Sequence, residues 1–327
     1  KRTALTEFRE QSRGGVGSKG AHTRDEDFTE YIYPATMHNT LLFFTQKGRC
    51  YWLKCYEIPE GAKNSKGRAI QNLLNIEADD AINAVLRIKN LNDKEFVDSH
   101  YVVFATKNGI IKKTCLEAYS RPRANGVNAI NILEGDQVVG VRLTNGHNEL
   151  LLANRNGRAI RFNEEELRPM GRVSTGVRGM RLDGGDDEVV GLVCVNDPQT
   201  ETIMVVSENG YGKRSDVDDY RKTARGAKGV KTISITEKTG RLVAIKVVTD
   251  ENDLMIINKS GILIRMKVAD VRVMGRATQG VRLINLTKKN DVIASVCKVM
   301  TETEEEPETI VDPDESPNVE NTENTEN

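Results

Sequence analysis

The 327-residue sequence is poor in aromatic residues, histidine and long apolar runs. Aromatic residues make up 5%, tryptophan occurs once, and the four histidines are not paired at metal-ligand spacing. No apolar stretch reaches the roughly 18 residues of a membrane-spanning helix, and the charged start is unlike a signal peptide. The five cysteines lack the spacing of a zinc site, so we expect reduced thiols and no metal. These absences argue against a helical membrane protein, a disulfide-stabilised domain and a metal enzyme.

The net charge of −1 hides two oppositely charged regions. Residues 301–327 contain eleven Asp and Glu and no Lys or Arg. Removing these eleven from the 48 acidic residues leaves 37 against 47 basic ones, so residues 1–300 carry a net charge of +10. We expect the tail, 301–327, to be disordered, and the basic body to bind a polyanion. The tail either competes with that polyanion for the body or only increases solubility.

The sequence repeats itself with a period near fifty residues. An apolar run, a turn ending in glycine and a second run recur five times, with turn glycines at Gly48, Gly109, Gly157, Gly210 and Gly261. Three of these turns are Asn-Gly, which adopts the positive φ of a two-residue hairpin most readily. A repeat of this length is typical of propellers, because one unit cannot bury both of its faces alone.

A second glycine follows each turn glycine by 17 or 19 residues, at Gly67, Gly126, Gly176, Gly229 and Gly280. A short alternating run and a third apolar run come after it, so each repeat predicts four short strands. The first repeat is incomplete, because residues 1–8 align with 112–119 and 213–220, just after a hairpin turn. We therefore expect a fragment of a longer protein whose first blade is truncated at the N-terminus.

These features predict an all-β, propeller-like disc over residues 1–300 with six four-stranded blades. The expected blades, numbered below as repeats 1 to 6, are residues 1–39, 40–99, 100–148, 149–200, 201–251 and 252–300.

Basic residues recur in the loop between the second strand and the second glycine of each repeat. Because the loop occupies the same point in every blade, we expect its cations to form a belt that binds the backbone of double-stranded DNA. No aromatic residue is interleaved with them and no recognition helix is apparent, which argues against single-strand stacking and major-groove readout. For any single loop, a solvated surface is the alternative. The candidates are Lys63, Lys66, Arg68, Arg121, Arg123, Arg168, Arg172, Arg178, Arg225, Lys228, Lys231, Arg272, Arg276 and Arg282.

The first repeat contains Gln11-Ser12-Arg13-Gly14-Gly15-Val16-Gly17. This segment resembles the Gln-Arg-Arg-Gly-Gly-Lys-Gly box of the C-terminal domain of the DNA gyrase A subunit, and five of the seven positions agree. Ser12 and Val16 depart from the box and remove two positive charges, one of which Lys19 is expected to replace. The resemblance extends over all six repeats.

The resemblance implies a β-pinwheel, in which neighbouring blades exchange strands, that wraps DNA around its rim with a positive sense and so supports ATP-dependent negative supercoiling. It assigns DNA contacts to Gln11, Arg13, Gly14, Gly15, Gly17 and Lys19, although the box could serve mainly as a turn that closes the disc. It also implies an A2B2 complex with the gyrase B-type chain and a second A-type chain, in the cytoplasm and on the chromosome, with no membrane partner. The sequence has no Arg-Tyr pair and no P-loop, so we expect no catalytic residue and no cofactor in this segment, with ATP and Mg²⁺ bound elsewhere in the enzyme.

Two alternatives remain open. The C-terminal domain of the topoisomerase IV A-type subunit is similar but typically lacks an intact box. A protein-binding propeller of the WD40 or kelch kind belongs to a different class; the single tryptophan, Trp52, and the absence of a Gly-His…Trp-Asp pattern argue against it. A chromatin-bound regulator of the RCC1 kind would share the disc but lack the box.

Overall fold

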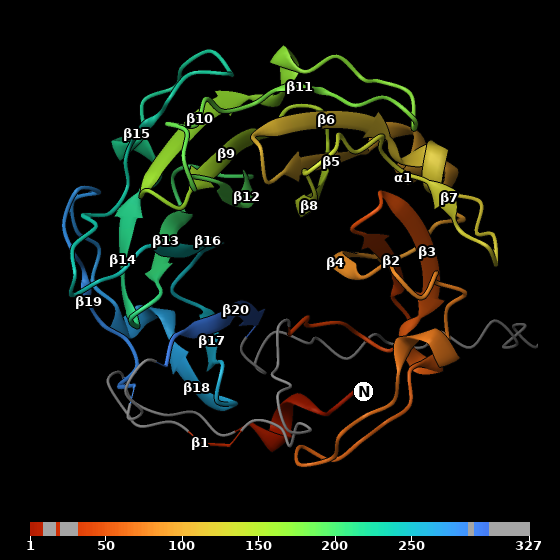
Figure 1. Ribbon diagram of the computed structural model, residues 1–327, viewed down its shortest axis with the longest axis horizontal. Coiled ribbons are helices and arrows are strands. Elements are labelled where there is room, and N and C mark those ends of the chain that lie inside the picture. Colours follow the sequence, from red (N-terminus) through yellow and green to blue (C-terminus); the bar gives the residue numbers. More distant parts are fainter. Residues whose placement is uncertain (9–17, 20–31, 287–290, 301–327) are drawn as a thin grey trace, which may run out of the picture.

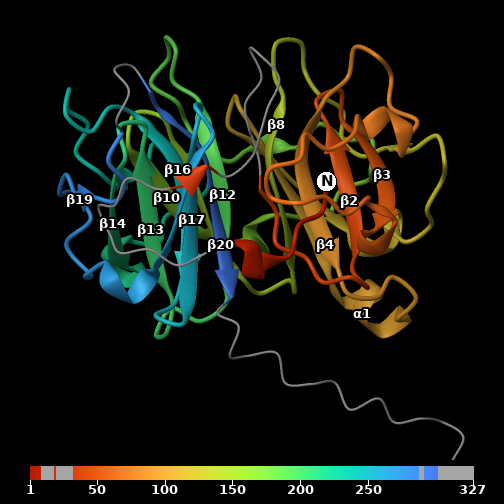
Figure 2. The same cartoon turned by 90° about the horizontal axis from the view of Figure 1, so that it is seen from below.

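The computed structural model describes residues 1–8, 18–19, 32–286 and 291–300. Within these residues, five antiparallel four-stranded sheets stand as blades around a ring (Figure 1). Seen edge-on, the strands run along the axis of the ring, and the short helix α1 (Lys94–Ser99) lies at one face (Figure 2). The prediction of an all-β ring of four-stranded blades is confirmed.

Each blade has the same strand order from the centre of the ring outwards. Repeat 2 forms β4 (Ile82–Ile88), β2 (Thr40–Thr45) and β3 (Arg49–Lys54), completed by β7 (Val127–Asn128). Repeat 3 forms β8 (Val138–Thr144), β5 (Tyr101–Thr106) and β6 (Ile110–Cys115), completed by β11 (Val177–Arg178). Repeat 4 forms β12 (Val189–Val195), β9 (Glu149–Asn154) and β10 (Arg158–Asn163), completed by β15 (Val230–Lys231). Repeat 5 forms β16 (Leu242–Val248), β13 (Thr202–Ser207) and β14 (Tyr211–Asp216), completed by β19 (Val281–Arg282). Repeat 6 forms β20 (Ile293–Met300), β17 (Asn252–Asn258) and β18 (Ile262–Lys267), completed by β1 (Ser18–Lys19).

A short 3-10 helix follows the second strand of the hairpin in each repeat. These helices are Leu5–Glu7, Cys55–Glu57, Leu116–Tyr119, Glu164–Glu166, Val217–Asp219 and Val268–Asp270, and a further one, Ile70–Asn72, lies in repeat 2.

The hairpins form as the Asn-Gly and related turns predict. Gly109, Gly157 and Gly210 have φ of 85°, 78° and 81°, a region that side chains with a Cβ disfavour. The first strand of each hairpin is buried along almost its whole length, because both of its faces are covered. Neighbouring blades cover these faces, except that one face of β2 packs on residues 55–76 of its own repeat and one face of β17 packs on Leu5 and Phe8. This double burial explains why these strands read as continuous apolar runs instead of alternating ones.

The outermost strand of every blade comes from another repeat. After its second glycine, each of repeats 3 to 6 crosses to the preceding blade, so that Val230 and Lys231 of repeat 5 pair with Ala159 and Arg158 of repeat 4. Gly229, with φ of 76°, makes this crossing possible, since a Cβ there would collide with the carbonyl oxygen of Ala159. The strand exchange that the resemblance implied is therefore present.

The apolar core lies between the blades. Phe44 of repeat 2 packs edge-on against Phe104 of repeat 3 at 5.1 Å between ring centroids, and Tyr119 completes the cluster. On the outer flank of repeat 6, Leu5 and Phe8 of repeat 1 pack against the buried residues of β17, β18 and β20. Repeat 1 thus covers a blade face that would otherwise be exposed to water, a source of stability at both ends of the chain.

One side-chain position links every repeat to the next. A side chain four positions after the turn glycine of repeats 2 to 6, and Arg2 at the equivalent position of repeat 1, donates a hydrogen bond to the neighbouring repeat. The acceptor is a main-chain carbonyl in or just after that repeat's 3-10 helix, as in the bond from Trp52 to Tyr119 O. The six bonds are Arg2 Nε to Ile58 O (3.2 Å), Trp52 Nε1 to Tyr119 O (3.0 Å), Lys113 Nζ to Glu164 O (3.3 Å), Arg161 Nη1 to Tyr220 O (3.0 Å), Arg214 Nη1 to Val271 O (3.3 Å) and Arg265 Nη1 to Phe8 O (3.2 Å). Because the last bond returns from repeat 6 to repeat 1, the described residues form a closed cycle.

The prediction of six blades is wrong for the described residues, which contain five sheets. Repeat 1 supplies β1 to the blade of repeat 6 and its 3-10 helix to the ring, but no sheet of its own. Residues 1–4 align with the last four residues of β14, yet no described strand pairs with them as β13 pairs with β14. A blade needs that hairpin as its two central strands, so repeat 1 remains an incomplete blade.

Candidate nucleic-acid interface

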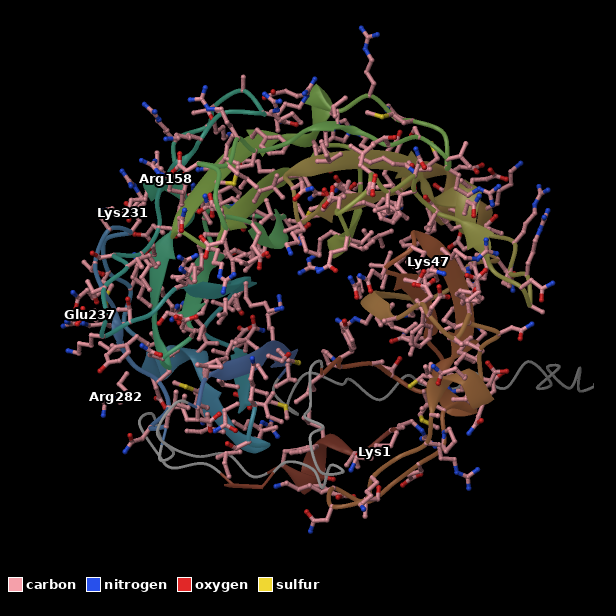
Figure 3. All side chains as sticks on the ribbon, viewed as in Figure 1. Lys1, Lys47, Arg158, Lys231, Glu237 and Arg282 are labelled. Atoms are coloured by element: carbon pink, nitrogen blue, oxygen red, sulfur yellow. The ribbon has the colours of Figure 1, made fainter. Side chains whose placement is uncertain are left out.

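The predicted basic loops lie along the outer edge of the ring. In repeats 3 to 6, each loop runs from a 3-10 helix to the outermost strand of the preceding blade, so the exchange of strands carries these loops to the periphery. The loop of repeat 2 has no such strand among the described residues and is bonded to Lys1 of repeat 1. Lys231 of β15 and Arg282 of β19 stand on this edge, with Arg158 of β10 nearby (Figure 3).

Many of the predicted cations have no intramolecular partner and are accessible to a ligand. Within the described ranges, the side chains of one set form no hydrogen bond and no ion pair, and apart from the half-buried Arg172 they are exposed. Cations without an intramolecular acid keep their full attraction for phosphate, which falls as the salt concentration rises. The set consists of Lys66, Arg68, Arg123, Arg168, Arg172, Arg178, Lys231 and Arg272.

Other predicted cations are used within the protein. Lys228 forms an ion pair with Asp183 that lowers the pKa of that carboxyl. Arg276 donates to the main-chain oxygens of Asp219 (2.9 Å) and Lys231 (2.7 Å).

The remaining predicted cations also have partners nearby. Arg282 donates to the Tyr211 hydroxyl at 2.9 Å, Arg225 to the Arg178 carbonyl at 3.1 Å, and Arg121 faces Glu117 at 3.6 Å. The ammonium of Lys63 lies 5.1 Å from the centroid of the Phe8 ring. The contacts of Arg282, Arg225 and Lys63 join separate parts of the chain, whereas the Arg121–Glu117 pair is exposed and local. All four contacts reduce the attraction of the cation for a ligand.

The residues of the glycine-rich box lie outside the described residues. Gln11, Arg13, Gly14, Gly15 and Gly17 therefore remain predictions. The backbone of Lys19, which follows the box, pairs with Ile262 in the blade of repeat 6. The segment after the box consequently meets the last blade, where the ring closes.

The described residues offer little chemistry beyond charge. In that part of the chain, no group of three His, Cys, Asp or Glu side chains could hold a metal ion, and no helix there has the length and apolarity to cross a bilayer. Burial raises the pKa of Cys194 to about 12 and that of Cys297 to about 11, so both thiols stay protonated at neutral pH and are poor nucleophiles. The arrangement suits binding to an extended anion.

Sequence reasoning missed a set of buried lysines behind these loops. Lys112 and Lys213 have no exposed surface, and each donates to a main-chain carbonyl of the following repeat's basic loop. The signal was available, since both occupy the same position of their repeats as Lys1.

Comparison with known proteins identifies relatives of this ring. The family described as DNA gyrase C-terminal domain, beta-propeller, matches residues 1–35, 39–89, 100–145, 148–196, 201–249 and 252–297. The DNA gyrase A subunit of Staphylococcus aureus strain MRSA252 is 44% identical over 308 residues, which are 94% of this chain and 34% of that protein. The subunit from strain NCTC 8325 is 44% identical over 306 residues. The chain thus spans about a third of the length of these relatives.

Solved structures share the fold. A DNA gyrase A C-terminal domain superposes with a TM-score of 0.80 at 24% identity and covers 91% of this chain and 94% of its own. The C-terminal domain of a DNA topoisomerase IV superposes with a TM-score of 0.70 at 28% identity, with 92% and 90% covered.

Proposed function

Because this chain belongs to the family of DNA gyrase C-terminal domains, we propose that it binds double-stranded DNA along the outer edge of its ring and wraps it with a positive sense. The observation that carries the proposal is the recurrence of exposed, unpaired cations in or directly after the loop between the 3-10 helix and the second glycine of consecutive repeats, among them Arg68, Arg123, Arg168, Lys231 and Arg272. A ligand that touches all of them must be long, anionic and curved.

The energetics of DNA bending fit this edge. Bending 20–30 base pairs by 40–90° costs on the order of 1–6 kcal/mol. Six to ten phosphate contacts make the affinity fall about 10³- to 10⁵-fold between 50 and 200 mM salt. Because these contacts are strongest at low salt, we expect them to offset the free-energy cost of bending there. Without a recognition helix among the described residues, where α1 has only 6 residues, the binding should depend little on sequence.

The role of the whole protein is part of the same proposal. A wrapped segment would be presented to the cleavage site of a type II topoisomerase, in an A2B2 complex with the gyrase B-type chain and a second A-type chain. That enzyme would use ATP and Mg²⁺ to introduce negative supercoils, in the cytoplasm and on the chromosome. The described residues contain no acidic cluster for a metal, so we assign this segment to DNA handling and the covalent chemistry to other parts of the enzyme.

Topoisomer analysis tests the proposal directly. A nicked plasmid is religated with the bound protein, freed of it, and resolved by electrophoresis at increasing protein concentration. Positive wrapping predicts a shift of the topoisomer distribution to positive linking difference, together with a steep decrease of affinity with salt. No binding at low salt would refute the proposal and favour a protein-binding propeller.

A second candidate follows from the similarity to the topoisomerase IV domain. A disc of that kind would tether DNA without a strong chiral wrap. Binding without a change in linking number would support this candidate instead.

A further inference from the structure

Three of the six repeats place a lysine at the same point of the hairpin's second strand. Lys1, Lys112 and Lys213 stand in repeats 1, 3 and 5, whereas Tyr51, Ile160 and Ile264 occupy this position in repeats 2, 4 and 6. Lys112 and Lys213 are fully buried. Buried lysines are rare unless paired, so their alternation along the ring calls for a common role.

Each of these lysines bonds to one tight turn in the following repeat. Lys1 Nζ donates to the carbonyls of Ala62 (2.7 Å), Lys63 (2.6 Å) and Ser65 (2.7 Å). Lys112 Nζ donates to the carbonyl of Arg172 and to that of Ala129 (2.6 Å). Lys213 Nζ donates to the carbonyl of Gly275 at 2.9 Å.

The three turns are built alike. In the turns 62–65, 171–174 and 275–278, the last residue is Ser or Thr. Its amide and its hydroxyl both donate to the first residue's carbonyl, at 2.9 and 2.9 Å for Ser65, 3.1 and 2.7 Å for Ser174, and 3.3 and 3.1 Å for Thr278. At the equivalent positions, 121–124 and 224–227, the loops that follow Tyr51 and Ile160 lack this pair of bonds. The same pair from Ser120 to Glu117 O lies earlier, at the end of a 3-10 helix, and Gly126 bonds to Arg123 O within that loop. A turn of this kind, five to two residues before the second glycine, is thus found in the repeats that follow Lys1, Lys112 and Lys213.

The second residue of each turn is a predicted DNA-contacting cation: Lys63, Arg172 or Arg276. We propose that Lys112 is a positioning residue that fixes the direction in which the turn 171–174 presents Arg172 to DNA, and that Lys1 and Lys213 hold the equivalent turns of their neighbouring repeats in the same way. This inference rests on the proposed function, because it assigns a role in DNA binding to residues that do not reach the ligand.

The chemistry of the site explains why lysine is used. Carbonyl oxygens that point inward from a turn need donors, and an ammonium supplies three on a flexible stem. Burial, reinforced by the positive charge of Arg172, lowers the pKa of Lys112 to about 7, and burial together with Arg276 does the same for Lys213 against the opposing effect of Asp219. Since a neutral amine still donates two hydrogen bonds, the turn stays held on both sides of this pKa.

The test replaces the buried lysine by the residue that occupies the same position in another repeat. Lys112→Ile copies Ile160, and Arg172→Ala removes the cation itself. Binding of a 40-base-pair duplex is measured by anisotropy from 50 to 200 mM salt for the parent, both single variants and the double variant. Removing one phosphate contact makes the salt dependence shallower by about 1 in d log K/d log[salt]. Lys47→Ile, in the β2–β3 turn where Lys47 pairs with Glu77 and Asp79, removes the same charge as a control.

We expect Lys112→Ile to lower the salt dependence by part of the Arg172→Ala effect, and to add nothing in the double variant. Lys47→Ile should leave it unchanged. A parent-like salt dependence of folded Lys112→Ile, or additive effects in the double variant, would overturn the inference while the effect of Arg172→Ala upheld the proposed function. Absence of DNA binding by the parent would refute the proposed function itself. If Lys112→Ile does not fold, Lys112→Met, which keeps the unbranched stem and removes the donors, repeats the cycle with Arg172→Ala.

Discussion

The basic residues inside the blades and those on the outer edge have the same chemistry but opposite surroundings. Arg265 is 7% exposed and bonds to Asp253 (2.7 Å) and to Phe8 O (3.2 Å). Arg272, seven positions later in the same repeat, is exposed and has no side-chain partner among the described residues. One closes the ring, and the other remains available to a ligand.

The comparison shows that the position in the repeat, and not the residue type, decides the role of a cation. A guanidinium that leaves water needs a carboxylate or carbonyls to offset its desolvation, so buried cations are tied to fixed partners. An exposed cation keeps its hydration and attracts phosphate over a distance of about 8–10 Å at physiological salt. Substitutions at the two kinds of site should therefore affect different measurements.

The largest expected effect on folding is at the closure of the ring. Arg265→Met should lower the free energy of unfolding by about 3–5 kcal/mol, because it leaves the Asp253 carboxylate buried without its partner. Urea unfolding followed by circular dichroism measures the loss, with Arg272→Met as the exposed control in the same repeat. Equal midpoints for the two variants would show that the bond to Phe8 and Asp253 does not stabilise the ring.

The crossing between blades should be the next most sensitive feature. Gly229→Ala is expected to cost at least about 1–3 kcal/mol, because φ is positive and the new Cβ meets the Ala159 carbonyl. Gly185→Ala is the matched control, since φ is 66° there but no atom lies within 4 Å of the new Cβ, and about 1–2 kcal/mol is expected. Thermal unfolding of both variants should separate the collision from the cost of the positive φ.

The buried lysines predict a pH dependence of stability. Above the folded pKa of about 7, Lys112 and Lys213 lose a proton in the folded state but keep it in the unfolded state up to the ordinary value of 10.5. Their contribution to stability therefore rises with pH in this window, by up to about 1.4 kcal/mol per pH unit and lysine. The difference between the free energy of unfolding of the parent and that of the Lys112→Ile, Lys213→Ile variant should therefore change in favour of the parent between pH 7 and 9. Parallel pH profiles would contradict the lowered pKa values.

The outer edge should affect folding least. Arg168→Ala combined with Arg272→Ala is expected to change the free energy of unfolding by less than about 0.5 kcal/mol, because both side chains are exposed and unpaired in the described part of the chain. The salt dependence of DNA binding should instead become shallower by about 2, or about 1 for each phosphate contact. An unchanged salt dependence would show that these two arginines lie off the DNA path.

Much of the architecture could be read from local signals. The hairpins follow from Asn-Gly turns between apolar runs, and the repeat of about fifty residues predicted blades, because both depend on neighbours in the sequence. The number of complete sheets did not follow, since a blade requires a paired hairpin and residues 1–4 have no such described partner. The uniform belt of cations did not follow either: Lys228 and Arg276 recur at the predicted point, yet contacts with Asp183 and with main-chain carbonyls occupy them.

The sequence by itself determined the all-β class, the repeat, the sign of the charge on the body and the family, because turn chemistry, apolar periodicity and composition are local properties. Only the tertiary structure decided which strand completes which blade, that Arg265 reaches back to Phe8, and which cations remain free. Those outcomes depend on side chains and carbonyls that are as many as 257 positions apart in the chain and meet only when the ring closes.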